Sequence, residues 1–89
     1  MEHVTIYTTP ICGYCERAKR LLQAKGVAYE EINVAMDAGL RREMMQRSGG
    51  RQTVPQIFVG SLHVGGSDEL AALERKGKLD GLLRGEQAR

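Results

Sequence analysis

Both cysteines of the chain lie in the stretch Thr8-Thr9-Pro10-Ile11-Cys12-Gly13-Tyr14-Cys15-Glu16-Arg17. Residues 3–8 alternate in polarity as a strand does, whereas residues 13–25 carry apolar side chains at helical spacing. At the start of a helix, unpaired backbone N–H groups point outward and stabilise a thiolate. A Cys-x-x-Cys pair at this junction therefore predicts redox chemistry at Cys12 and Cys15.

The remainder of the chain predicts alternating strands and helices. We expect strands at residues 3–8, 27–34, 56–59 and 62–64, and helices at residues 13–25, 37–47, 67–76 and 79–83. The helix near residue 67 is expected to begin with Ser67 or Asp68 as its N-cap. The first helix is long enough for a right-handed parallel crossover, and Gly60-Ser61 predicts a two-residue hairpin turn.

This order of elements is typical of an α/β protein with the thioredoxin-like fold, in which three or more helices flank a four-stranded mixed sheet. We expect a single domain at residues 1–84 and a frayed C-terminal tail at residues 85–89. No basic segment followed by an apolar one opens the chain, so the expected location is cytoplasmic.

The composition argues against nucleic acids and membranes as partners. Thirteen basic and 11 acidic residues are spread along the chain and give a net charge of only +2, without the concentrated basic face that nucleic acids require. Three tyrosines and one phenylalanine are too few for a base-stacking platform. The longest apolar runs have three or four residues, far below the roughly 20 that cross a bilayer.

The two thiols are expected to be inequivalent. Cys12 lies at the helix start, where its sulfur faces backbone N–H groups, and should act as the nucleophile. Cys15 lies one turn later on the apolar side, where its pKa should stay high, so it should resolve a mixed disulfide formed at Cys12. Tyr14 is expected to form an exposed wall beside the reactive thiol.

Other interpretations of the cysteines and their neighbours carry less weight. Zinc would need a second ligand pair, and His3 and His63 lack ligand spacing. Two inert buried thiols disagree with the exposed turn that Pro10 and Gly13 predict. We expect His63 to be an exposed hairpin residue. The basic side chains after the thiols are expected to form a solvated helix face: Arg17, Lys19 and Arg20.

Three motifs in order, Cys12-Gly13-Tyr14-Cys15, Thr53-Val54-Pro55-Gln56-Ile57-Phe58 and Gly65-Gly66-Ser67-Asp68, make the chain resemble a glutaredoxin. The likeness covers residues 1–83 and is greatest to the short bacterial dithiol kind. The resemblance implies a glutathione-dependent thiol–disulfide oxidoreductase that reduces disulfide-containing and glutathionylated proteins. Glutathione would be a co-substrate, with no tightly bound cofactor.

The resemblance also implies a set of glutathione contacts. Pro55 matches the family's cis-proline, and a cis bond there leaves the Val54 backbone free to pair with an extended peptide. Thr53 matches a residue that contacts the far end of glutathione. The turn that binds the γ-glutamyl group corresponds to Gly66, Ser67 and Asp68. Cys12 and Tyr14 complete the expected site.

Two departures from the family pattern leave alternatives open. Thr8-Thr9 occupy the region where many members carry a lysine for the glycine carboxylate of glutathione, and Arg41 or Arg42 are candidates for that charge. Gly13 replaces the commoner proline, and some glutaredoxins without that proline hold a [2Fe–2S] cluster between two subunits through the first cysteine. The chain would then be a dimer with Cys12 as the metal ligand, whereas without a cluster we expect a monomer.

A third alternative is a thioredoxin-like electron donor that is reduced by a flavoenzyme. Ser67-Asp68 argue against it, since a γ-glutamyl site has no purpose there.

Overall fold

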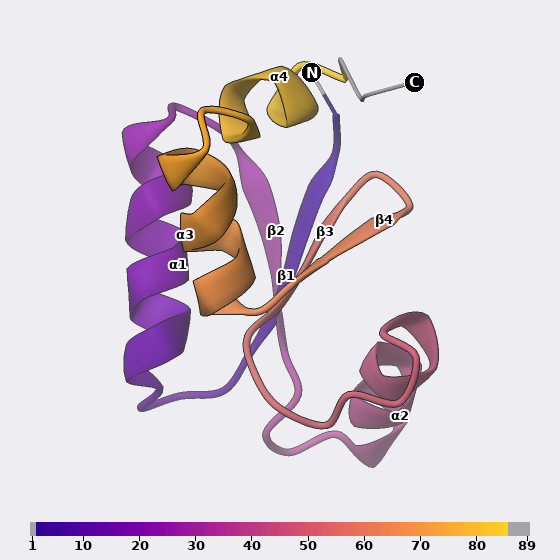
Figure 1. Cartoon of the computed structure of the whole chain (residues 1–89). Coiled ribbons are helices and arrows are strands. Elements are labelled where there is room, and N and C mark those ends of the chain that lie inside the picture. The colour runs from indigo at the N-terminus through magenta and orange to yellow at the C-terminus, as the bar shows by residue number, and fades with distance from the viewer. Residues whose placement is uncertain (1, 86–89) are drawn as a thin grey trace.

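A four-stranded mixed sheet lies at the centre of the protein in the computed structural model, which describes residues 2–85 (Figure 1). The elements in chain order are β1 Val4–Thr8, α1 Gly13–Ala24, β2 Tyr29–Asn33, α2 Ala38–Arg47, β3 Gln56–Val59, β4 Leu62–Gly65, α3 Ser67–Arg75 and α4 Leu79–Leu83. The strands lie in the order β2-β1-β3-β4. Strand β1 pairs in parallel with β2, and the other pairs are antiparallel. The predicted thioredoxin-like fold is confirmed.

The period-two alternation of the central strands divides the apolar core in two. Ile6 and Ile57 face α1, α3 and α4 in one cluster of buried side chains. Tyr7 and Phe58, their chain neighbours, face α2 in a second cluster that includes Met44. Figure 1 shows α1 and α3 together on one side of the sheet and α2 on the other. The sheet therefore fixes the ends of α1 and α3 relative to each other.

Helix α1 ends where the sequence predicts, and the β3–β4 hairpin turns where the sequence predicts. Gly26 follows the helix with φ +71°, a conformation that glycine adopts without a steric penalty. In the hairpin, Gly60 has φ +59° and Ser61 keeps a negative φ, which is the expected glycine-first turn.

Helix α3 begins differently from the prediction. Gly66 is its N-cap, so Ser67 and Asp68 are the first helical residues and neither caps the helix. The Glu69 carboxylate accepts a 2.6 Å hydrogen bond from the Gly66 N–H, and this bond holds the pKa of Glu69 below its usual value. Helix α3 starts one residue earlier than predicted because the side chain of Glu69, three positions after the N-cap, accepts from the free Gly66 N–H. No side chain is therefore needed at the cap position itself.

Helix α2 is tied to the sheet by a polar network around Tyr7. The Tyr7 hydroxyl donates to a Glu43 oxygen at 2.6 Å and accepts from Arg47 Nη1 at 2.7 Å. The Arg47 guanidinium also lies 4.1 Å from the centre of the Phe58 ring. Burial and the Glu43 hydrogen bond raise the pKa of Tyr7, so the phenol stays protonated and donates across the physiological range.

The described residues contain no helix that is long and apolar enough to cross a membrane. Of the predicted tail, Gly85 is described, and its N–H donates to the Leu82 carbonyl at 3.0 Å. Residues 86–89 lie outside the described residues. The domain boundary at residue 84 stays a prediction.

Candidate active site

Cys12 is the N-cap of α1, as the sequence predicts. Its backbone is extended, with φ −132° and ψ 106°, and its Sγ accepts a 3.1 Å hydrogen bond from the Cys15 N–H. The thiol is half-buried and forms no disulfide. An N–H donor and the positive end of a helix dipole both favour the anionic form of sulfur. Cys12 therefore has the surroundings of a nucleophile.

Cys15 has the opposite surroundings. Its side chain is fully buried beside Ala18 and Leu22 in the α1 part of the core. Burial, and secondly the hydrogen bond with Cys12, raises the pKa of the Cys15 thiol from 9.0 to about 12. The thiol is thus protonated at neutral pH, so the two cysteines have different surroundings, and their separate roles stay a prediction.

This raised pKa gives a pH dependence of stability. Above the ordinary value of 9.0 the unfolded chain releases the Cys15 proton, whereas the folded protein keeps it until about pH 12. The unfolded state then binds fewer protons, so the free energy of unfolding should fall as pH rises through this window. Urea unfolding of the reduced protein at about pH 8 and about pH 10 measures the fall.

The Cys15→Ser variant is the control, because it keeps every other titrating group. Its free energy of unfolding should fall less between the two pH values than that of the wild type. Equal falls in the two proteins would contradict the buried, protonated thiol.

The helix face after the thiols is less solvated than predicted. Tyr14 is 59% exposed beside Cys12, as expected, and the Arg17 guanidinium lies 5.5 Å from the centre of its ring. Lys19, in contrast, is 17% exposed and pairs with Glu16 at 2.8 Å and Glu31 at 3.1 Å. These carboxylates raise the pKa of Lys19. The prediction of a solvated face was wrong for Lys19 because β2 brings Glu31 against α1.

A pocket of about 240 Å³ has Tyr14 of the Cys-x-x-Cys motif as one of its walls, whereas Cys12 does not line it. The Val54–Pro55 peptide bond is cis, as the resemblance implies. The pocket brings together eight further residues besides Tyr14, from the loop before β3 and the start of α3: Arg51, Thr53, Val54, Pro55, Gly66, Ser67, Asp68 and Glu69. The structure thus gathers the three predicted motifs at one end of the molecule.

Buried polar side chains hold the loop of Thr53 in place. Gln56 is fully buried, and its Nε2 donates to the Thr53 carbonyl at 3.0 Å and to Thr53 Oγ1 at 3.2 Å. Since a carbonyl only accepts, this orientation directs Gln56 Oε1 to His63 Nε2, 2.7 Å away, which must donate. Thr53 is therefore fixed by a chain of hydrogen bonds that begins on β4.

His63 is half-buried, so the prediction of an exposed hairpin residue was wrong. Its ring stacks on Phe58 with centres 4.9 Å apart, and the stacking draws it against the sheet. Burial, and then the nearby charge of Arg51, lower the pKa of His63, so the ring is neutral at physiological pH.

Two pocket residues were missed by sequence reasoning, Arg51 and Glu69. Arg51 Nη2 and Glu69 Oε1 lie 3.6 Å apart and form an ion pair at the pocket wall. Glu69 had a readable signal, because it stands three residues after Gly66 in the spacing of a capping box. Arg51 had none beyond its place in the loop before Thr53. Neither of the two cations that the sequence offered, Arg41 and Arg42, lines the pocket, and Arg41 donates to the Gln52 carbonyl at 3.3 Å.

Among residues 2–85, no group of three or more histidine, cysteine, aspartate or glutamate side chains is placed to hold a metal ion.

Comparisons with known proteins agree with this architecture. The family model for glutaredoxin matches residues 4–64. Glutaredoxin 3 of Escherichia coli (strain K12) is 51% identical over 84 residues, which cover 94% of this chain and 100% of the relative. The solution structure of a glutaredoxin from Brucella melitensis is 54% identical with a TM-score of 0.86, covering 100% of this chain and 96% of that one. A buckwheat glutaredoxin–glutathione complex is 30% identical with a TM-score of 0.84, covering 98% and 83%. The chain belongs to the glutaredoxin family.

Proposed function

We propose that the protein is a glutathione-dependent thiol–disulfide oxidoreductase that reduces glutathione mixed disulfides and protein disulfides. The observation that carries the proposal is the unequal pair of thiols at the start of α1, one accepting a backbone N–H and one buried and protonated. Tyr14, which lies between the two cysteines in the chain, lines a pocket together with the cis-proline loop and the start of α3. The buckwheat relative with the same fold forms a complex with glutathione.

With a glutathionylated protein, the Cys12 thiolate attacks the glutathione sulfur of the mixed disulfide. The S–S bond between the client cysteine and glutathione breaks, its electron pair leaves on the client sulfur as a thiolate, and a Cys12–glutathione disulfide forms. The thiolate of a second glutathione then attacks the glutathione sulfur of that disulfide. Oxidised glutathione leaves, and the Cys12 thiolate is restored.

With a protein disulfide, Cys12 attacks one sulfur and releases the other as a thiolate. The Cys15 thiol, once it has lost its proton, attacks the Cys12 sulfur of the mixed disulfide and releases the second client thiolate. Two glutathione molecules reduce the resulting Cys12–Cys15 disulfide and leave as oxidised glutathione. The high pKa of Cys15 keeps this thiol from competing with Cys12 for the incoming disulfide.

The pocket suits the charges of a bound tripeptide. The Val54 backbone, beside the cis bond, offers a strand-like pairing edge to glutathione. A γ-glutamyl carboxylate fits the N-terminal N–H groups of α3, and Asp68 can pair with its ammonium group. Arg51, which lies 3.6 Å from Glu69 at the start of α3, is a cation of this pocket that can pair with a carboxylate of glutathione.

Glu69 should affect the binding of glutathione because it holds the shape of the turn at Gly66. We expect Glu69→Ala to raise the KM for glutathione roughly fivefold, because the hydrogen bond that caps α3 at Gly66 is lost. Glu69→Gln keeps an acceptor for the Gly66 N–H and should stay within about twofold of the wild type. Steady-state assays with varied glutathione measure both, and a normal KM for Glu69→Ala would contradict this role.

The proposed function is tested by the choice of reductant. Turnover of a glutathione mixed disulfide is followed by NADPH consumption, with glutathione plus glutathione reductase in one assay and thioredoxin reductase alone in the other. The proposal predicts turnover only with glutathione. Equal or faster turnover with thioredoxin reductase would identify a thioredoxin-like donor instead.

Location, oligomeric state and cluster binding belong to the proposal as expectations. We propose a cytoplasmic monomer, since reduced glutathione is the thiol buffer of that compartment. The glutathione-ligated [2Fe–2S] dimer stays a prediction. A side chain at Gly13 would meet no atom within 4 Å, so the surface beside Cys12 is open in this chain.

A further inference from the structure

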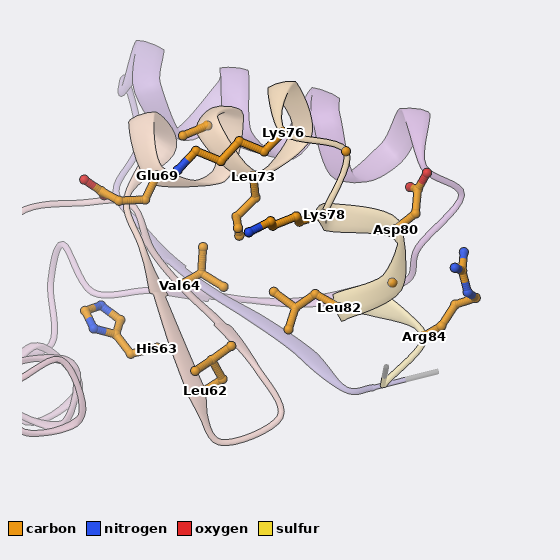
Figure 2. Close-up of a pocket in the computed structure, with 13 residues that line it drawn as sticks. Leu62, His63, Val64, Glu69, Leu73, Lys76, Lys78, Asp80, Leu82 and Arg84 are labelled. Carbon is orange, nitrogen blue, oxygen red and sulfur yellow. The ribbon is translucent and has the colours of Figure 1, made fainter. Parts of the chain in front are cut away.

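A second and larger groove, of about 1010 Å³, lies between β4 and helices α3 and α4 (Figure 2). Its floor is apolar, with two side chains from β4, one from α3 and one from α4: Leu62, Val64, Leu73 and Leu82. Leu62 is 40% exposed. Strand β4 lies at the edge of the sheet, and no further strand among the described residues pairs with its outer edge. We call this surface the α3–α4 groove.

The rim of the α3–α4 groove is positively charged. Neither Lys76 nor Lys78 forms an ion pair or a side-chain hydrogen bond with any of residues 2–85. Figure 2 shows Lys78 directed toward the middle of the groove and Lys76 directed toward its Glu69 end. The two acidic rim residues are already engaged. Asp80 pairs with Lys25 at 2.9 Å, and Glu69 holds the Gly66 N–H. A ligand therefore meets uncompensated lysine charge above an aliphatic floor.

The α3–α4 groove and the proposed glutathione pocket share one lining residue. Glu69 lines both, at the start of α3, and His63 of the Thr53 hydrogen-bond chain also lines the groove. A polypeptide that presents a sulfur to Cys12 can therefore continue past Glu69 onto this surface. Glutathione itself is too short to occupy both spaces.

We propose that the α3–α4 groove docks a segment of the client protein, rich in acidic and aliphatic residues, that flanks the cysteine attacked by Cys12. This inference rests on the proposed function, because the client is a substrate of that site. The aliphatic side chains cover the leucine and valine floor, and the carboxylates pair with Lys76 and Lys78. The groove thereby selects among protein clients and leaves small disulfides unaffected.

The test compares two glutathionylated peptides that differ only in the residues flanking cysteine. One flank alternates glutamate with leucine, and the other alternates lysine with leucine. At low ionic strength the wild type should have a kcat/KM for the acidic peptide higher by roughly tenfold, and added salt should reduce the difference. In the variant K76E/K78E, the kcat/KM for the acidic peptide should fall at least roughly fivefold.

A matched control variant separates the effect of the groove lysines from the effect of the protein's net charge. The variant R20E/R75E makes the same change in net charge on exposed residues that do not line the groove. Its preference for the acidic peptide should remain within about twofold of the wild type. An equal loss in both variants would mean general steering by charge and would overturn the proposal.

A small substrate keeps this test distinct from that of the proposed function. Reduction of 2-hydroxyethyl disulfide with glutathione should proceed at the wild-type rate in K76E/K78E and R20E/R75E. If the wild type itself did not reduce this substrate, the proposed function would be contradicted. Equal rates on the two peptides would overturn the docking proposal alone. So would a wild-type dimer in sedimentation analysis that K76E/K78E dissociates, since the groove would then hold a second copy of the chain.

Discussion

Replacement of Cys12 by serine should abolish turnover of both glutathione mixed disulfides and protein disulfides. A serine hydroxyl does not ionise near neutral pH, and no other thiol can take its place because Cys15 is buried and protonated. The rate should fall at least about a thousandfold, to the background of free glutathione. The coupled assay with glutathione reductase measures this, and a normal urea midpoint shows that the variant is folded.

The Cys15→Ser variant is the matched comparison for this result. Glutathione can release Cys12 from its mixed disulfide without a second protein thiol, so deglutathionylation should stay within about threefold of the wild type. Turnover in the Cys12→Ser variant at the normal rate would overturn the assignment of the nucleophile. A Cys15→Ser variant as inactive as Cys12→Ser would show that the buried thiol takes part in every cycle.

Truncation of Phe58 should produce the largest loss of stability in the chain. The ring contacts Tyr7 edge-on with centres 5.7 Å apart, stacks on His63 and lies under the Arg47 guanidinium. Phe58→Ala removes all three contacts and leaves a cavity, at a cost of about 3–5 kcal/mol. Small domains are stable by only about 5–15 kcal/mol in total, so much of the protein should unfold at mild urea concentrations.

Phe58→Leu separates the aromatic contacts from the volume. Leucine fills most of the space but has no ring for Arg47 or His63, so the expected cost is about 1–2 kcal/mol. Urea unfolding followed by circular dichroism measures both variants. If alanine and leucine cost the same, the loss would come from the aromatic contacts and not from packing of the core.

The sequence is informative about the fold because its signals are local. Alternation places Ile6 and Tyr7 on opposite faces of the sheet, and a glycine-first turn fixes the β3–β4 pairing. The N-cap of α3 was misplaced, since a hydroxyl or carboxylate is the usual cap and Gly66 has no side chain. The structure shows that Glu69 supplies the acceptor from inside the helix.

The candidate site could be predicted only where chemistry follows from adjacent residues. Cys12 and Cys15 are two positions apart, so their inequivalence follows from the helix that contains them. Arg51 meets Glu69 only after β3 and β4 have paired, and no spacing in the chain reveals this. The same holds for the α3–α4 groove, whose floor joins β4 to two helices. Contacts made by tertiary folding are therefore the part that sequence reasoning missed.

Helix α1 makes Cys12 the thiol that carries glutathione and keeps the buried Cys15 thiol from reacting with an incoming disulfide. The most direct measurement mixes reduced Cys12→Ser and Cys15→Ser variants with oxidised glutathione, stops the reaction with acid and follows the intact masses with time. Cys15→Ser should gain one glutathione, on Cys12, at least about a hundredfold faster than Cys12→Ser gains one on Cys15. Equal rates in the two variants would contradict this difference in reactivity between Cys12 and Cys15.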